Sequence, residues 1–349
     1  MSPAERTKIE LPGLTGQEIF YDNSMLEVFR RCHRQYYLTH VRHWKPEKTA
    51  HDLIFGLSWH AAMDVVWALA NGPEDDATVI AQAMQEFLKT WREYYPEFEN
   101  QSLLGPAAED EFYPKTPGRA MEMLSWYLKK RRHIIAKYEV LAIELPFIVP
   151  LSETGGEIYY IGRLDKVYKD IDRRVYIVDH KTTKSPKGQW QATFWPNNQM
   201  SGYMYNGVLA YGPDFAGINI DGALCQKGSA RERFEPDLPP GIGFPQVPLL
   251  ASTAETEAWL WETNYTILLL QSHLDMLKEC KPNDRFLRAF DKRTTACGYY
   301  SGCIYRSICA YIPNPAALEE PPAGFKKEEW RPFDIVMSEK PFDGNMGGE

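Results

Sequence analysis

Two neighbouring apolar runs near the middle of the chain each lead into an aspartate. Residues 159–161 (Tyr-Tyr-Ile) precede Asp165, and residues 175–178 (Val-Tyr-Ile-Val) precede Asp179. β-Branched and aromatic residues of this kind are typical of strands, and the polar break at 170–173 is typical of a turn. The pattern predicts a β-hairpin, so the chain must fold around a sheet that carries both acids.

The charged residues of this hairpin have the composition of a metal site. Side chains alternate between faces along a strand, so Asp179 and Lys181 share one face and His180 points the other way. With Asp165 on the partner strand, two carboxylates and an ammonium come within reach of one another. Divalent-metal sites for phosphodiester hydrolysis use these groups.

A simpler interpretation of the same residues is a set of ion pairs. Asp165 could pair with Arg163 or Lys166, and Asp179 with Lys181 could form a surface pair. However, Asp179 follows an apolar run that we expect to be buried. An unpaired carboxylate there is costly, and a bound cation would offset that cost. Both interpretations stand on these residues alone.

Periodicity and end signals predict an α/β fold, a mixed sheet core with helical flanks. Four helices are expected at about 24–44, 52–70, 76–94 and 118–138, followed by a strand at 140–149 that contains Glu144. After the hairpin we expect a helix at 197–211 with Gln199 and Tyr203 on one face, a strand at 217–226 and a helix at 253–280. The predicted units are a helical region 1–139, a core 140–230, a helical region 231–312 and an irregular tail 313–349, together forming one compact body.

Composition and charge restrict the partners. No apolar run is long enough to span a membrane, and the start of the chain lacks a signal peptide, which indicates a cytoplasmic, intracellular protein without a membrane partner. A net charge of −8 argues against a protein coated with positive charge for nucleic-acid binding. DNA would then enter a narrow basic channel, and we expect the arginine-rich helix around Cys32 to line it.

Four of the six cysteines suggest a second metal centre. Three of them, Cys297, Cys303 and Cys309, crowd together near the C-terminus, and Cys32 lies on the first predicted helix. Thiolates suit iron–sulfur clusters or zinc. The other two, Cys225 and Cys280, are interpreted as ordinary small apolar residues.

An ordered set of motifs resembles the RecB-type branch of the PD-(D/E)XK nuclease superfamily. The set has a G-x-x-x-H helix at 56–60, Glu144 in a strand, G-x-x-D at 162–165, D-x-K-T at 179–182 and Q-x-x-x-Y at 199–203. Any one element is a weak signal, but the order is specific. The resemblance implies a restriction-endonuclease-like core with the element order αβββαβ.

The resemblance also implies roles for individual residues. His60, Asp165 and Asp179, with the backbone carbonyl of His180, would bind Mg²⁺ or Mn²⁺, and Lys181 would assist the attacking water. The remaining motif residues would shape the site or contact DNA: Glu144, Gln199 and Tyr203.

The cysteines extend the resemblance to an iron–sulfur branch that includes AddB-type and CRISPR-associated RecB-like exonucleases. In that branch, one cysteine before the core and three after it hold a 4Fe-4S cluster. Cys32 resembles the first, and Cys297, Cys303 and Cys309 resemble the other three. The spacing here is C-x5-C-x5-C where C-x2-C-x5-C is commoner, which leaves zinc as an alternative.

The resemblance implies a metal-dependent DNA exonuclease for recombination, repair or end processing, acting on single-stranded DNA or free ends. Two alternatives are a non-catalytic DNA-end-binding or scaffold protein of the same fold and a zinc-stabilised nucleic-acid-binding module. Every acidic and lysine position of the motifs is filled, which disfavours an inactive copy. The chain has no G-x-x-x-x-G-K-[ST] motif, so a helicase or recombination partner would be a separate protein.

Overall fold

The computed structural model describes residues 18–96, 111–151, 158–185, 188–228, 233–298 and 302–331. Residues 332–349 of the expected irregular tail lie outside this set. The central sheet has seven strands: β1 (Ile19–Asp22), β3 (Glu139–Pro150), β4 (Ile158–Lys169), β5 (Val175–Thr183), β6 (Phe215–Cys225), β7 (Ile242–Gly243) and β8 (Gln246–Leu250). Their order is β1-β4-β5-β6-β7, with β3 paired to β4 and β8 paired to β6.

The predicted hairpin is formed by β4 and β5, and its two strands separate partway along. They pair antiparallel only where residues 166–169 of β4 meet residues 175–178 of β5. Earlier in β4, residues 158–161 pair with β1, and after residue 178, β5 continues beside β6. Asp165 and Asp179 are the first residues beyond the shared segment, so both acids lie where the strands diverge.

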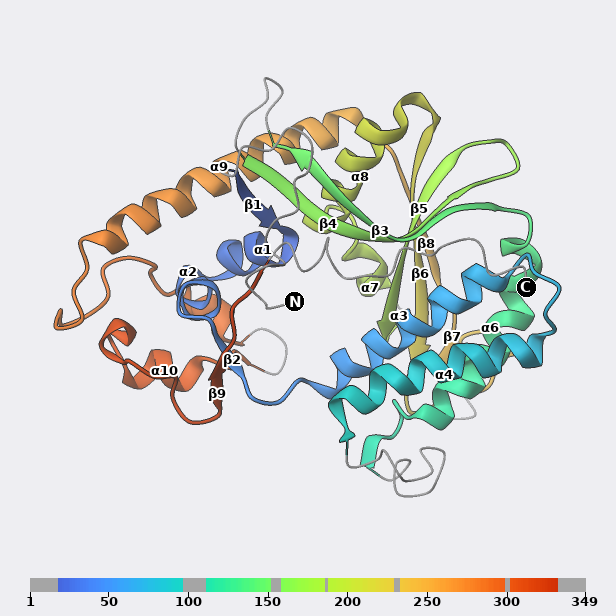
Figure 1. Ribbon diagram of the computed structural model, residues 1–349, viewed down its shortest axis with the longest axis horizontal. Helices are drawn as coiled ribbons and strands as arrows, with labels where there is room; N and C mark the ends of the chain where they lie inside the picture. The colour runs from blue at the N-terminus through green and yellow to red at the C-terminus, as the bar shows by residue number, and fades with distance from the viewer. Residues whose placement is uncertain are drawn as a thin grey trace, which may run out of the picture.

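Helices cover both faces of the sheet (Figure 1). One face carries α3 (His51–Leu69), α4 (Asp76–Tyr94) and α6 (Pro117–Ile135), and the other carries α1 (Asn23–Arg31), α8 (Asn198–Tyr211) and α9 (Thr253–Lys278). Strand alternation divides the core accordingly: Val178 joins the first group of helices, and Ile177 joins the second. The expected α/β core with the order αβββαβ is confirmed.

The remaining elements are short. They are α2 (His33–Tyr36), the π-helical turn η2 (Tyr37–Val41), α7 (Gly188–Ala192), η4 (Gly212–Asp214), η5 (Thr294–Gly298), α10 (Arg306–Tyr311), η6 (Pro315–Ala317) and a two-stranded sheet of β2 (Trp44–Pro46) with β9 (Phe325–Lys327). No helix among the described residues is both long and apolar enough to cross a bilayer.

The single helix predicted over 24–44 is wrong, because the chain breaks at Cys32. Cys32 has an extended backbone, with φ −161° and ψ 117°, and separates α1 from α2. The N-cap is Asp22, two residues before the predicted start of the helix, and its side chain accepts a hydrogen bond from the Met25 amide at 2.9 Å. The break turns Arg34 inward, where it is 3% exposed.

Three arginines near Cys32 hold the fold together instead of lining a channel, contrary to expectation, whereas Arg31 is exposed and donates to Gln35. Arg30 donates to the Thr263 hydroxyl of α9 at 3.0 Å, and Arg34 donates to the Phe290 carbonyl at 2.9 Å. Arg42 donates to the Pro315 carbonyl at 2.7 Å. These guanidinium groups therefore fasten the N-terminal helices to the C-terminal third of the chain.

His40 makes the stability of this junction sensitive to acid. Burial, together with nearby His43 and Lys45, lowers the pKa of His40 to about 4, and neither ring nitrogen has a hydrogen-bond partner among the described residues. Unfolded histidine titrates near 6.5, so acidification below that value protonates the unfolded chain first and favours unfolding.

We therefore expect His40 to contribute roughly 2 kcal/mol to the unfolding free energy that the protein loses between about pH 7 and pH 5, at about 1.4 kcal/mol per pH unit below 6.5. Urea denaturation at both pH values should show that His40→Phe removes this loss. The exposed His133 on α6, replaced by Gln, serves as the control. An equal acid loss in His40→Phe and wild type would contradict the assignment.

Candidate active site

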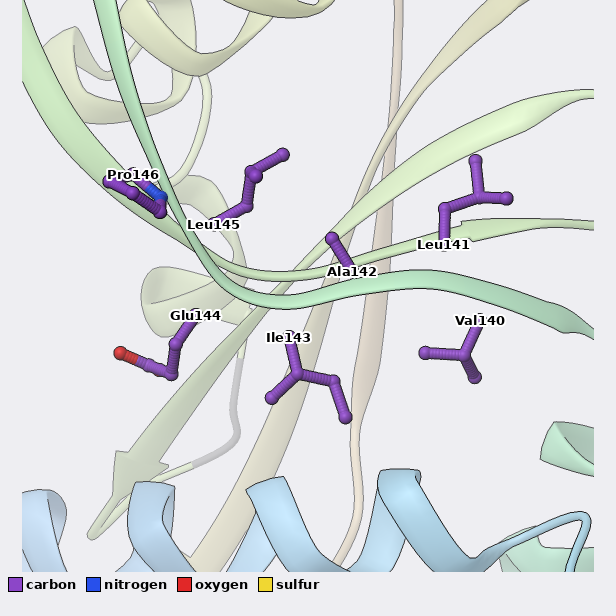
Figure 2. A pocket seen from close by; sticks show the side chains of 7 residues that line it. All are labelled: Val140, Leu141, Ala142, Ile143, Glu144, Leu145 and Pro146. Carbon is purple, nitrogen blue, oxygen red and sulfur yellow. The ribbon is translucent and has the colours of Figure 1, made fainter. Parts of the chain in front are cut away.

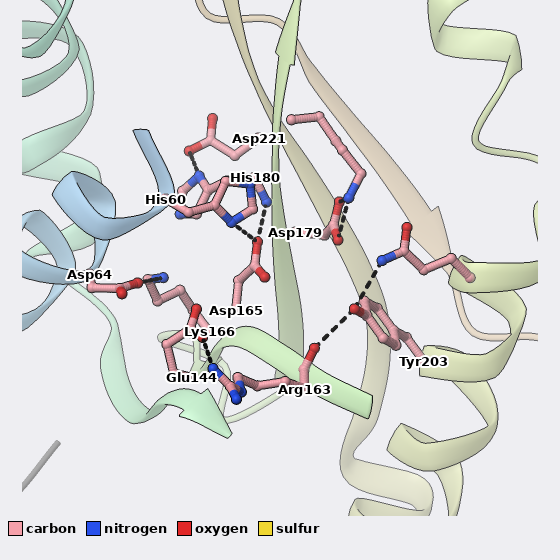
Figure 3. Close-up of polar contacts among 12 residues, drawn as sticks. His60, Asp64, Glu144, Arg163, Asp165, Lys166, Asp179, His180, Tyr203 and Asp221 are labelled. Atoms are coloured by element: carbon pink, nitrogen blue, oxygen red, sulfur yellow. Dashed lines mark hydrogen bonds and ion pairs between the residues drawn. The ribbon is translucent and has the colours of Figure 1, made fainter. Parts of the chain in front are cut away.

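Asp165 of β4 is held by groups from two other elements (Figure 3). Its Oδ2 accepts a hydrogen bond from the backbone N–H of His180 at 2.7 Å and lies 3.2 Å from Nδ1 of His60. His60 is on α3, and Gly56, one turn earlier on the same helix, faces Thr182 of β5. Neither Arg163 nor Lys166 pairs with Asp165, so the predicted ion-pair alternative is wrong for this residue.

Asp179 and Lys181 of β5 form the second half of the site. Nζ of Lys181 lies 2.8 Å from Oδ1 and 2.6 Å from Oδ2 of Asp179. Asp179 is only 1% exposed, whereas the Lys181 side chain is 29% exposed. The surface pair considered for these residues is thus a buried carboxylate with an ammonium that reaches solvent.

The charges in this site are strongly coupled. Burial raises the pKa of Asp179, although Lys181 opposes the shift. Burial has the same tendency at Asp165, but the His60 and lysine charges outweigh it and lower the pKa of that carboxyl. Burial alone would lower the pKa of His60, yet Asp165 raises it. Two carboxylates therefore share positive charge supplied by His60 and Lys181.

Glu144 of β3 lies beside Asp165 of β4 and Asp64 of α3. Ile143 pairs with Lys166 and Leu145 with Leu164, so Glu144 stands opposite Asp165. Its φ of +52° is a strained value for a non-glycine residue, and it turns Glu144 to the side of Ile143 in the pocket lined by residues 140–146 (Figure 2). Oε2 of Glu144 accepts from Arg163 at 3.1 Å, while burial, Asp64 and Asp165 raise the pKa of Glu144.

Gln199 and Tyr203 connect α8 to the same segment of β4. The Tyr203 hydroxyl donates to the Arg163 carbonyl at 2.9 Å and accepts from the Gln199 amide at 3.0 Å. Tyr203 is 6% exposed, so its hydroxyl acts inside the protein. These two residues support the strand that carries Asp165.

Tyr203→Phe should remove this support. We expect a loss of about 1–3 kcal/mol in unfolding free energy, because the buried Arg163 carbonyl loses its donor. A displaced Asp165 should lower nuclease activity by roughly tenfold to a hundredfold. Tyr205→Phe is the matched control, since its hydroxyl donates from the same helix to the Pro150 carbonyl at 2.9 Å. Equal activity losses in the two variants would contradict a positioning role for Tyr203.

Two polar groups beneath the site escaped prediction. Lys166 is 0% exposed, and its Nζ lies 2.5 Å from Oδ1 of Asp64 on α3. His180, also fully buried, lies 3.4 Å from Oδ2 of Asp221, which accepts from the Tyr127 hydroxyl at 2.5 Å. Signals existed for both groups, because Asp64 is one helical turn from His60 and Asp221 interrupts an apolar strand.

The four predicted cluster cysteines lie near one another around α2, η5 and α10. Cys32 is buried, and Cys297, Cys303 and Cys309 are half-buried. Burial raises the pKa of Cys309 to about 11, and the neighbouring Cys32 and Cys303 add to this effect. No three of the four sulfurs lie within 4.8 Å of one another in the described residues.

The two other cysteines lie apart from this group. Cys225 donates to the Pro114 carbonyl at 3.2 Å from a fully buried position, and Cys280 donates to the Met276 carbonyl at 3.4 Å. Both contacts are ordinary packing arrangements for a thiol.

Comparison with known proteins agrees with the site. A sequence profile described as the PD-(D/E)XK nuclease superfamily matches residues 23–310, which include β3, β4, β5, α8 and the four clustered cysteines. No curated protein matches the chain. Since the matched range covers most of the 349 residues, the chain belongs to the PD-(D/E)XK nuclease superfamily, whose members are generally hydrolytic nucleases.

Proposed function

We propose that the protein is a divalent-metal-dependent deoxyribonuclease that degrades DNA from free ends, as an exonuclease. The observation that carries this proposal is the convergence of Asp165, Asp179, Lys181 and His60 where β4 and β5 diverge. Diverging strands leave the two carboxylates side by side without a strand between them. A substrate phosphate and a cation can then approach the same oxygens.

The donor set fits Mg²⁺ or Mn²⁺. Asp165 and Asp179 are hard oxygen donors, and His60 adds a nitrogen that Mn²⁺ accepts more readily than Mg²⁺. Oδ2 of Asp179 is buried, and the Lys181 ammonium, 2.6 Å away, is the positive charge that compensates it in the metal-free protein. His60, Asp165, Asp179 and the His180 carbonyl would hold the ion, which would supply Lewis acidity and an activated water.

The protein's own residues would do the positioning. The His180 amide orients Asp165, and Tyr203 with Gln199 supports β4 at Arg163. Lys181 has an exposed ammonium that can attract the scissile phosphate and orient the attacking water. Glu144 adds a third carboxylate that shapes the site, neutralised in part by Arg163.

A cleavage assay on matched DNA substrates tests this proposal. We expect end-labelled linear DNA to be degraded with Mn²⁺ or Mg²⁺ and to stay intact in EDTA, while covalently closed circular DNA resists. Single-stranded and duplex linear forms should be compared at equal end concentration. Cleavage in EDTA would contradict metal dependence, and equal cutting of circles would show an endonuclease.

We further propose that Cys32, Cys297, Cys303 and Cys309 hold a 4Fe-4S cluster. The thiols perturb one another, and two backbone amides donate to sulfurs of the group: that of Arg293 to Cys32 and that of Tyr305 to Cys303. Visible absorbance, iron and acid-labile sulfide in anaerobically purified protein should test this. Stoichiometric zinc without sulfide would contradict it.

In this proposal the core 140–230 carries the cutting site, and the flanking regions 1–139 and 231–312 enclose it and supply the cysteines. The work would be DNA recombination, repair or end processing. A helicase or recombination partner is part of this proposal, and the 349 residues themselves contain no G-x-x-x-x-G-K-[ST] motif.

A further inference from the structure

A short segment, residues 287–293, wraps around the break between α1 and α2 and is called the strap here. Its carbonyls at Leu287 and Phe290 accept from the Arg34 guanidinium at 3.3 and 2.9 Å, and the Arg34 amide donates to the Asp291 carbonyl at 3.0 Å. Phe290 is fully buried with a φ of +55°. The surrounding contacts therefore impose a strained backbone on the strap.

Three ionisable side chains meet at the strap in a way that suggests a metal site. Nδ1 of His33 lies 2.6 Å from Oδ1 of Asp291, and Nε2 of His273 lies 3.9 Å from the same oxygen. Among the described residues, this is the one group of three such ligands within 4.8 Å. Metal binding would need a lone pair on each ring nitrogen that faces Asp291.

The hydrogen bonds of the two histidines show that their lone pairs point away from Asp291. The Arg293 guanidinium, always a donor, lies 2.9 Å from Nε2 of His33, and the Phe290 amide donates to Nδ1 of His273 at 3.0 Å. In neutral rings the protons must then sit on Nδ1 of His33 and Nε2 of His273, both facing the carboxylate. We call His33, His273, Arg293 and Asp291 the clamp, because the two ring N–H groups hold the Asp291 carboxylate. The same N–H groups would repel a cation at this place.

The clamp delivers one backbone donor to a cysteine. Arg293 also donates to the Arg30 carbonyl at 2.7 Å, which fixes the end of the strap on α1. In this position the Arg293 amide lies 3.5 Å from Sγ of Cys32 and donates to it. On the other side, Lys292 donates to the Cys309 carbonyl at 2.5 Å. The strap therefore touches two of the four clustered cysteines.

We propose that Arg293 and Asp291 are positioning residues that hold the Arg293 amide against the Cys32 sulfur and thereby raise the reduction potential of the cluster. This inference rests on the proposed cluster. An N–H donor stabilises the more negative, reduced form more than the oxidised form, and hydrogen bonds to sulfur are one of the factors that set cluster potentials. Loss of the clamp should make the cluster harder to reduce.

The test is a potentiometric titration of the full-length protein, reconstituted anaerobically with ferrous iron and sulfide and followed by absorbance and electron paramagnetic resonance. Arg293→Gln and Asp291→Asn should lower the midpoint potential of the cluster. At the wild-type midpoint, the ratio of reduced to oxidised cluster should fall about tenfold, which corresponds to about 59 mV for one electron. The control is Arg288→Gln, on the same strap, where Arg288 pairs with Asp284 and is 62% exposed. It should keep the wild-type midpoint.

The outcomes separate the two proposals. Wild-type protein that takes up no iron and sulfide would overturn the cluster and this inference with it, while the cleavage assay would still report on the nuclease. Variants that keep the cluster and the wild-type midpoint would overturn only the clamp. If Arg293→Gln loses its cluster, Arg293→Lys, which keeps a donor for the Arg30 carbonyl, is titrated in its place.

Discussion

Asp179→Asn is expected to reduce DNA cleavage by at least about a thousandfold while the protein stays folded. The substitution keeps the shape of the side chain and removes the charge that would bind the metal ion. Because burial raises the pKa of Asp179, the ionised carboxylate is unfavourable in the metal-free protein. Thermal unfolding in EDTA should therefore show equal or higher stability for the variant.

This combination distinguishes a metal site from a structural ion pair. If the Asp179–Lys181 pair only stabilised the fold, Asp179→Asn would lower stability and leave cleavage largely intact. Asp172→Asn, an exposed aspartate in the turn of the same hairpin, is the matched control and should behave as wild type. Wild-type cleavage by Asp179→Asn would show that the site is elsewhere.

Lys181→Met complements this experiment. Without metal, the variant leaves the buried Asp179 carboxylate unpaired, and it should be less stable than wild type in EDTA. A divalent ion binds the folded state and can replace the missing charge, so added Mn²⁺ should restore much of that stability. The same variant should stay inactive with Mn²⁺ bound, because the positive charge beside the phosphate is missing. A stability deficit that Mn²⁺ does not change would argue against metal binding at Asp179.

Lys166→Ala is expected to cause the largest loss of stability, about 3–5 kcal/mol in unfolding free energy by urea denaturation. The Lys166 side chain is 0% exposed, and Asp64 on α3 is its ion-pair partner at 2.5 Å. Removal of the lysine leaves a cavity and an uncompensated carboxylate under the site. Lys89→Ala, which breaks an exposed pair with Glu86, is the control and should change stability by less than about 1 kcal/mol.

The double variant Lys166→Met with Asp64→Leu tests the cause. Replacement of both partners by apolar groups of similar size should recover most of the stability lost in Lys166→Ala, because neither charge is left buried alone. If the double variant does not regain stability, the loss in Lys166→Ala comes mainly from packing around the lysine methylenes and not from the unpaired charge. Both Lys166→Ala and the double variant should have the far-ultraviolet circular dichroism of wild type before denaturation.

Much of the core follows from local sequence. Strand alternation at 175–181 predicts that Asp179 and Lys181 face together and His180 faces away, and the structure has this arrangement. Alternation is a property of the extended backbone and needs no tertiary information. Helical periodicity with clear end signals likewise predicts α3, α4, α6, α8 and α9.

Other features depend on contacts that local sequence does not encode. A helix over 24–44 has good periodicity, yet the chain breaks at Cys32, where Arg34 turns toward carbonyls more than 250 residues away. The basic residues beside Cys32 look like a nucleic-acid surface in sequence. The hydrogen bonds that Arg30 donates to α9 and Arg34 donates to the strap show that these two side chains satisfy hydroxyl and backbone groups inside the fold instead.

The sequence therefore predicts which residues belong to the site, because spacing along one strand or helix determines which side chains share a face. The sequence does not predict how these residues are arranged in space, because that depends on where β4 leaves β5 and on which helix packs there. The pairing of β4 with β5 ends at Lys166 and Val178, so the strands are open at Asp165 and Asp179, and α3 brings His60 to that opening. Long-range packing decides both, and the same packing brings Cys32 to cysteines at the far end of the chain.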